Sequence, residues 1–265
     1  MGRENNMSKN FNTVYGKFDL ETLMTKQDQL LNFIPHGHMI PNHAIATTIA
    51  CMGFIEEIYE ILEARGFRSW RLTTDHDPDN VYGKPKPTED REEETADSLF
   101  FYLEIMLFQG FSEADVMSAI SVLMTEQTKR ELECESFAKL CEYFDPAFAT
   151  LAGKDSRIFI NDSMEYDEYR QVYIDLSTSL VIRTMVFMNT IGFKSWRPDR
   201  LSKEKQLEEF AKMTILYAQL LILNISSLDN LVAEYDKKWE INKQRWAKAN
   251  EGNFDWDHRD TKESL

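Results

Sequence analysis

The chain has 265 residues, of which 43% are hydrophobic, and its formal net charge at pH 7 is −15. This length allows one large domain or two small ones, and the hydrophobic content is enough for a buried core. The negative charge argues against a general nucleic-acid or membrane-surface binder, because phosphate backbones and anionic lipids attract basic surfaces. A nucleotide held through metal ions is not excluded.

Glycine and proline are scarce, at 10 and 7 residues, and long segments show a helical period. The predicted fold class is therefore all-α, a helical bundle. The three cysteines, Cys51, Cys134 and Cys141, have no C-x-x-C spacing; this favours free thiols in a reducing cytoplasm. The polar start MGRENNMSKN gives no secretion signal, and no run of residues approaches the length of a membrane span.

Helices are predicted along most of the chain. They span about 19–34, 43–65, 91–109 and 112–142 in the first half, and about 165–191, 203–225 and 227–249 in the second. Ser112, followed by acidic residues in the first turn, predicts a capped start for the fourth helix. The polar segment at about 72–90 is rich in Asp, Asn, Pro and Gly; it is either a functional lid or a flexible insertion.

A short motif occurs twice. GFRSWR at 66–71 returns as GFKSWR at 192–197, and each copy ends an apolar helix. We therefore expect two tandem degenerate helical repeats, at 19–142 and 165–256, joined by a linker or strand-like crossover. Alignment of the copies places Glu57 on Arg183, Glu60 on Val186, Glu94 on Glu209 and Asp97 on Lys212.

Two acidic pairs stand at i,i+3 spacing in predicted helices: Glu57 with Glu60, and Glu94 with Asp97. Residues three apart share a helix face, so two such helices side by side would gather four carboxylates around one point. Hard oxygen ligands in this arrangement suit Mg²⁺. The alternative is a solvated surface, because Glu is a strong helix former and most such pairs face water.

The surroundings of Asp97 favour the metal site. The helix after it is apolar nearly all round, which is typical of a buried helix. A buried carboxylate is costly unless it is paired or bound to a metal. Glu57 borders a similar apolar arc, whereas Glu104 is left open as an extra ligand, a supporting group or the partner of a Lys or Arg.

These motifs resemble those of the all-α nucleoside triphosphate pyrophosphohydrolases, the superfamily of dimeric dUTPases, phage dCTPase/dUTPases and MazG-like enzymes. Its hallmark is E-x-x-E, a loop and E-x-x-D. The segment Phe67-Arg68-Ser69-Trp70 is similar to an aromatic-basic element of the dimeric dUTPases, and QLLN, from Gln29 to Asn32, resembles part of their first helix. Their last motif, Y-x-x-K-x-x-x-N-x-x-R, is matched by Tyr235, Lys238, Asn242 and Arg245.

The resemblance implies an enzyme that uses Mg²⁺ to hydrolyse a deoxynucleoside triphosphate, dUTP or dCTP foremost, to the monophosphate and pyrophosphate. It implies a metal site formed by Glu57, Glu60, Glu94 and Asp97, in which Glu60 also orients or deprotonates the attacking water. The implied substrate-binding residues are Gln29, Asn32, Lys238, Asn242 and Arg245.

The chain departs from the family because the acids lie in the first copy and the Lys-Asn-Arg motif in the second. Either one composite site spans a monomeric pseudodimer, or residues 19–142 are complete, with Arg130 serving the phosphates. A homodimer could also supply side chains in trans. The competing function is a helical binding or inhibitory protein that has kept the fold and lost catalysis. A di-iron bundle is disfavoured because these helices have no Glu-x-x-His pair.

Overall fold

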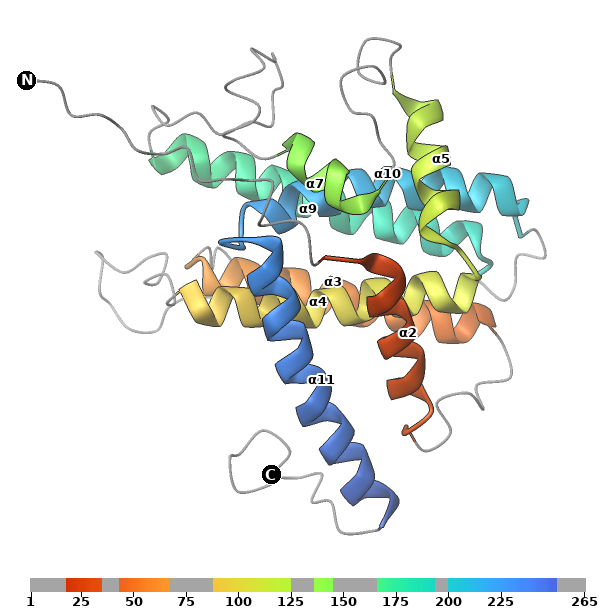
Figure 1. The fold of residues 1–265 in the computed structure, drawn as a ribbon. Helices are drawn as coiled ribbons and strands as arrows, with labels where there is room; N and C mark the ends of the chain where they lie inside the picture. The colour runs from red at the N-terminus through yellow and green to blue at the C-terminus, as the bar shows by residue number, and fades with distance from the viewer. Residues whose placement is uncertain are drawn as a thin grey trace, which may run out of the picture.

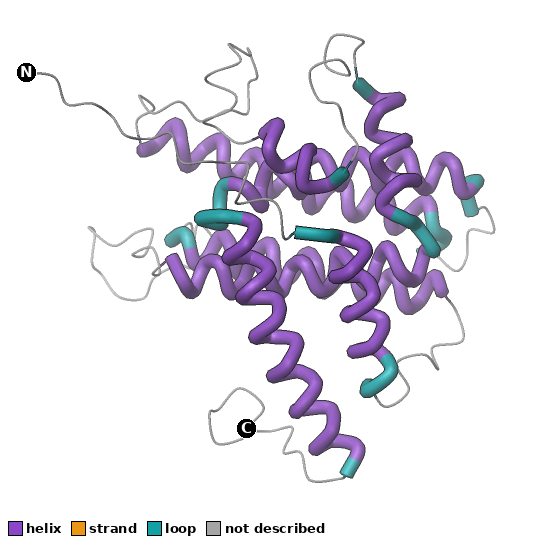
Figure 2. The backbone as a smooth tube through the Cα atoms, in the orientation of Figure 1, coloured by secondary structure: helices purple, strands orange, loops and turns teal. Residues whose placement is uncertain are grey.

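The computed structural model describes residues 18–34, 43–66, 88–124, 136–144, 166–193 and 200–251. Within these ranges every regular element is an α-helix, which confirms the predicted all-α class (Figure 2). The helices are α2 (Leu20–Leu31), α3 (His43–Ala64), α4 (Thr88–Gln109), α5 (Glu113–Leu123), α7 (Phe137–Phe144), α9 (Tyr166–Thr190), α10 (Lys203–Ile222) and α11 (Leu228–Asn250). None of these described helices is long and apolar enough to cross a membrane.

The helices pack as two pairs with flanking elements (Figure 1). α3 lies along α4, α9 lies along α10, and the two pairs meet where α3 contacts α9. α2 and α11 cross α4 on its other side, while α5 and α7 cover α10. Buried side chains from both halves of the chain form one hydrophobic core. The division into units at 19–142 and 165–256 stays a prediction.

An aromatic centre fixes the rotation of α4 against α10. Tyr102 and Tyr217 are fully buried with ring centroids 4.9 Å apart. Their hydroxyls pair with Thr214 and Ser98 respectively, each at 3.0 Å, so the polar atoms buried with the rings are satisfied. Because Ser98 faces α10, its neighbour Asp97 lies about 100° round the helix and faces away from this core.

The helix ends follow from local sequence. Ser112 forms a capping box with Asp115 at the start of α5, as predicted. Gly66 and Gly192 follow the ends of α3 and α9 at φ angles of 80° and 84°, a region that glycine enters without steric cost. Both copies of the GF[RK]SWR motif therefore begin with a glycine in the left-handed conformation that ends a helix.

One predicted helix is wrong. Residues 112–142 were expected to form a single helix, but α5 ends at Leu123, where Met124 takes an extended backbone, and α7 begins at Phe137. The sequence TEQTKR at 125–130 offers no apolar residue with which to continue a buried face. The Phe67–Trp70 element, most of the polar 72–90 segment, the crossover and Arg130 lie outside the described residues.

Candidate metal centre

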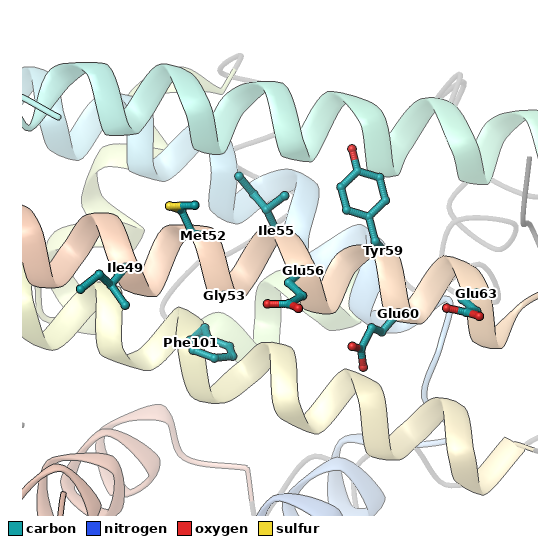
Figure 3. A pocket seen from close by; sticks show the side chains of 9 residues that line it. All are labelled: Ile49, Met52, Gly53, Ile55, Glu56, Tyr59, Glu60, Glu63 and Phe101. Carbon is teal, nitrogen blue, oxygen red and sulfur yellow. The ribbon is translucent and has the colours of Figure 1, made fainter. Parts of the chain in front are cut away.

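Three of the four predicted metal ligands lie together between α3 and α4. Glu57, Glu94 and Asp97 each offer a carboxylate oxygen, and these oxygens lie within 4.8 Å of one another. Each side chain is half-buried. Glu60, one turn after Glu57, is more exposed and points from α3 towards α4 (Figure 3). We call Glu57, Glu60, Glu94 and Asp97 the acid cluster.

The cluster carries an excess of negative charge. Burial, followed by the charges of Asp97, Glu60 and Glu94, raises the pKa of Glu57 to about 9. Partial burial and the neighbouring Glu94 raise the pKa of Glu60 to about 7. Burial also raises the pKa of Asp97, and this effect outweighs the opposing charge of Lys238. Such carboxylates ionise only at a cost unless a cation joins them.

Lys238 of α11 reaches this cluster from the second half of the chain. Its Nζ atom lies 2.7 Å from Asp97 Oδ2 and 2.7 Å from Glu93 Oε1. Burial alone would lower the pKa of Lys238, but Asp97 and Glu93 together hold it above its usual value. The lysine therefore stays charged and offsets part of the negative charge.

Two contacts hold α11 in position for this. The backbone N–H of Ser226, just before α11, donates to Glu92 Oε1 of α4 at 2.7 Å. Farther along, the rings of Tyr235 and Phe100 stack with centroids 4.3 Å apart. Lys238 follows one turn after this stacked pair, which directs its side chain along α4 towards Asp97.

The donor set fits a hard divalent cation. All the cluster's ligand atoms are carboxylate oxygens, which Mg²⁺ prefers. Glu57 Oε2 is buried and has no hydrogen-bond partner among the described residues. A buried unpaired carboxylate oxygen is costly, and a bound cation would satisfy it. Glu57, Glu94 and Asp97 could therefore hold Mg²⁺, with Glu60 at the exposed edge.

The predicted substrate residues Gln29, in α2, and Asn32, just after it, have exposed side chains. The Asn32 amide donates to the carbonyl of Asp28 in α2 at 2.8 Å. The glutamine that α2 directs towards α4 is Gln27, which is fully buried. Gln27 lies one turn from both Leu23 and Leu31 on the apolar face of α2. This spacing in the sequence could have predicted that Gln27, and not Gln29, is buried.

Gln27 links three helices. Its amide donates to Glu104 of α4 at 3.0 Å and accepts from the Tyr235 hydroxyl of α11 at 2.9 Å. The sequence left three roles open for Glu104: an extra metal ligand, a supporting group, or the partner of a Lys or Arg. In the structure its hydrogen-bond partner is a glutamine. Burial raises the pKa of Glu104 to about 7, although the Gln27 amide opposes this shift.

Asn242 and Arg245 continue the face of α11 that carries Lys238, and both are half-buried. Arg245 Nε is buried and has no hydrogen-bond partner within the described ranges. An unsatisfied guanidinium N–H is a suitable donor for an anionic ligand.

The α9/α10 pair carries a different arrangement at the aligned positions. Arg183 of α9, aligned with Glu57, has its Nη1 atom 3.5 Å from Glu209 Oε2. Lys212 of α10, aligned with Asp97, has its Nζ atom 2.6 Å from Glu209 Oε1. Here the side chains of the chain itself supply the positive charge.

A groove on the outer face of α3 was not predicted. It has a volume of about 1030 Å³ and meets the acid cluster at Glu60 (Figure 3). Its lining is formed by Ile49, Met52, Gly53, Ile55, Glu56, Tyr59, Glu60, Glu63 and Phe101. Apolar residues at 49, 52 and 59 were available as a signal, because they share one helix face.

No protein-family model matches the chain, and comparisons with curated proteins and with solved structures find no match either. The assignment of a function therefore depends on the geometry and on the motif resemblance.

Proposed function

We propose that the protein is a pyrophosphohydrolase that uses Mg²⁺ to cleave a deoxynucleoside triphosphate, dUTP or dCTP foremost, between its α and β phosphates. The observation that carries the proposal is the convergence of the half-buried Glu57, Glu94 and Asp97 from two helices around one point. Four acidic positions gathered in this way repel a triphosphate unless cations intervene, and Mg²⁺ is the usual partner of phosphate groups.

In this proposal the acid cluster positions Mg²⁺, which, when bound, neutralises the phosphate charge that otherwise opposes attack by water. Glu57, Glu94 and Asp97 supply the buried oxygens. Glu60 lies at the exposed edge, where it can accept the proton of the attacking water. The exposure of its side chain leaves room for a water molecule beside it, which a general base requires.

Lys238 has two roles in this proposal. It pairs with Asp97 and Glu93 in the ligand-free protein, at 2.7 Å from each. When a triphosphate is bound, its ammonium group is placed to contact a phosphate oxygen instead, together with Arg245 farther along α11. A lysine from the second half of the chain would thereby complete the acid site of the first half. This is the composite site that the placement of the motifs predicts.

A second candidate function is supported by the same ion pairs. If Lys238 permanently takes the place of a metal ion at Asp97, the protein is a helical binding or inhibitory module without turnover. In that case the raised pKa values of Glu57 and Glu60 reflect a partly protonated and inactive cluster.

Incubation of the purified protein with each dNTP and with dUTP, with and without Mg²⁺, separates the two functions. The proposal predicts release of pyrophosphate that stops on addition of a chelator. The Glu57→Gln variant should be inactive, whereas Asp175→Asn, which removes an exposed charge from α9, should retain full activity. Release of orthophosphate alone would reject pyrophosphohydrolysis, and no product from the whole panel would favour the binding module.

A further inference from the structure

The groove on the outer face of α3 is a surface feature that the acid cluster does not explain. Its apolar lining is unusually exposed for side chains of this kind, at 54% for Ile49 and 58% for Met52. The aromatic rings of Phe101 and Tyr59 stand on either side of α3 in the close view (Figure 3). Exposed apolar surface that gathers in a hollow usually marks a binding site.

Gly53 shapes the bottom of this groove. A Cβ atom at position 53 would lie 2.3 Å from Cε1 of Phe101, so the ring packs directly against the bare backbone of α3. Any other residue would displace the ring or fill the hollow. The missing side chain therefore lets Phe101 of α4 form one wall of the groove.

The groove and the acid cluster are continuous. Glu60 belongs to both, and Phe101 stands one turn after Asp97 on α4. Gly53 precedes Glu60 by seven residues, about 10 Å along the axis at the α-helical rise per residue. An extended ligand with its phosphates at the cluster could thus place a second, apolar part against Phe101.

We infer that this groove holds the base and sugar of the nucleotide, with the flat base against Phe101, Ile49 and Met52 and the phosphates at the acid cluster. An uncharged aromatic ring suits the apolar wall, since aromatic surfaces attract one another by stacking and edge contacts. The groove has an apolar end at Ile49 and Met52 and an acidic end at Glu60, where bound cations can bridge carboxylates to phosphates, and this favours the stated orientation over the reverse. The inference rests on the proposed function, whose phosphate site it extends.

A second copy of the chain fits the same surface less well. A two-fold interface brings the same patch of both subunits together. Here it would bring Glu56, Glu60 and Glu63 of both subunits into one interface, and gathering like charges at an interface is costly.

The test compares ligands with and without a base. The α,β-imido analogues of dUTP and dCTP resist cleavage between the α and β phosphates, and inorganic triphosphate lacks the nucleoside. Titration calorimetry with Mg²⁺ should show at least one analogue binding tenfold or more tightly than inorganic triphosphate. Met52→Gln should remove most of this difference and leave the affinity for inorganic triphosphate unchanged.

Met185→Gln is the matched control, because Met185 of α9 is exposed to 55%, close to the 58% of Met52, and lies outside the groove. This variant should bind all three probes as the wild type does. Phe101→Leu, which removes the ring but keeps an apolar side chain, should weaken only the nucleotide analogues. If the Phe101→Leu variant does not fold, the Met52→Gln variant still tests the inference, because Met52 is exposed.

Equal affinity of the analogues and inorganic triphosphate would overturn the inference and leave the proposed function intact. So would a Met52→Gln variant that separates a dimer into monomers, measured by light scattering, without changing nucleotide affinity. If none of the three probes binds, the proposed function and the inference fail together.

Discussion

The two helix pairs of this protein treat buried charge in opposite ways. Between α3 and α4, the pKa values of Glu57, Glu60 and Asp97 are all raised, first by burial and then by the charges of neighbouring carboxylates. Between α9 and α10, Arg183 and Lys212 both reach Glu209, and the pKa of Lys212 is raised by its hydrogen bonds to Glu208 and Glu209. The α9/α10 pair neutralises Glu209 with its own basic side chains, whereas the α3/α4 pair leaves its carboxylates short of positive charge.

In the proposed function, the difference in charge between the α3/α4 and α9/α10 pairs means that only the first pair needs a cation from outside the chain to balance its carboxylates. Replacing an acid by Arg183 or Lys212 supplies a fixed positive charge and removes the reason to bind a metal ion. In the proposed function, keeping the acids preserves affinity for a cation at a cost in stability. The tandem repeat itself stays a prediction, but its aligned positions do lie together in each pair.

The largest expected effect comes from removing an acid of the α3/α4 pair. Glu57→Gln and Asp97→Asn keep the shape of the side chain and remove its charge. Each should lower kcat/KM for the preferred dNTP by about a hundredfold or more, the scale seen when a group that stabilises transition-state charge is lost. Steady-state pyrophosphate release measures this, and activity within threefold of wild type in both variants would place the reaction elsewhere.

The contribution of α11 should be smaller. The double variant Lys238→Ala with Arg245→Ala removes both cations of the Lys-Asn-Arg face. It should lower kcat/KM at least tenfold, about 1.4 kcal/mol of transition-state stabilisation. Unchanged kinetics in a folded double variant would reject the composite site and leave residues 19–142 as the sole catalytic unit.

The stability of the two pairs should respond in opposite directions. In the presence of chelator, Glu57→Gln should raise Tm, because it removes a carboxyl that burial and the neighbouring acids keep from ionising in the folded state. Glu209→Gln should lower Tm, because it leaves Arg183 and Lys212 without their shared carboxylate. Each kcal/mol corresponds to about 2–4 °C for a chain of this size. Thermal denaturation measures both, and shifts of the same sign would contradict the contrast.

The pH dependence of stability gives the finest test. A carboxyl whose pKa is raised on folding binds its proton more tightly in the folded state, so it stabilises the fold at low pH and loses this effect as pH rises through the folded value. For Glu60 and Glu57 these values are about 7 and about 9. The Tm of the metal-free protein should therefore fall between about pH 5 and pH 9.

Glu57→Gln should flatten the upper part of this curve, and saturating Mg²⁺ should raise Tm more at pH 9 than at pH 6, because protons compete with the metal for the same oxygens. Circular dichroism melts at several pH values are sufficient. A wild-type Tm that rises with pH throughout this range would mean that folding does not raise the pKa values of Glu57 and Glu60.

Much of the acid cluster was predictable because its signal is local. The i,i+3 spacing of Glu94 and Asp97, just before an apolar run, implies one shared face at the edge of the core, and the structure brings both half-buried side chains together there. The capping box at Ser112 is equally local, since it lies within one turn. Such features depend on neighbours along the chain, which the sequence displays directly.

The remaining features depend on packing between distant segments. Gln27 and Gln29 are both polar residues of one short helix, and contacts with Glu104 and Tyr235 decide which is buried. Lys238 meets Asp97 across 141 residues of sequence, a contact that no local pattern encodes. The groove depends on the fit of Phe101 against Gly53, which only the packed helices define.

The central claim is that the α3/α4 pair binds a divalent cation and the α9/α10 pair does not. Titration with Mn²⁺, followed by the loss of its free electron paramagnetic resonance signal, tests this without any turnover. The account predicts binding by the wild type and by Glu209→Gln, and loss of that binding in Glu57→Gln. Absence of binding in the wild type, or equal binding in wild type and Glu57→Gln, would contradict it.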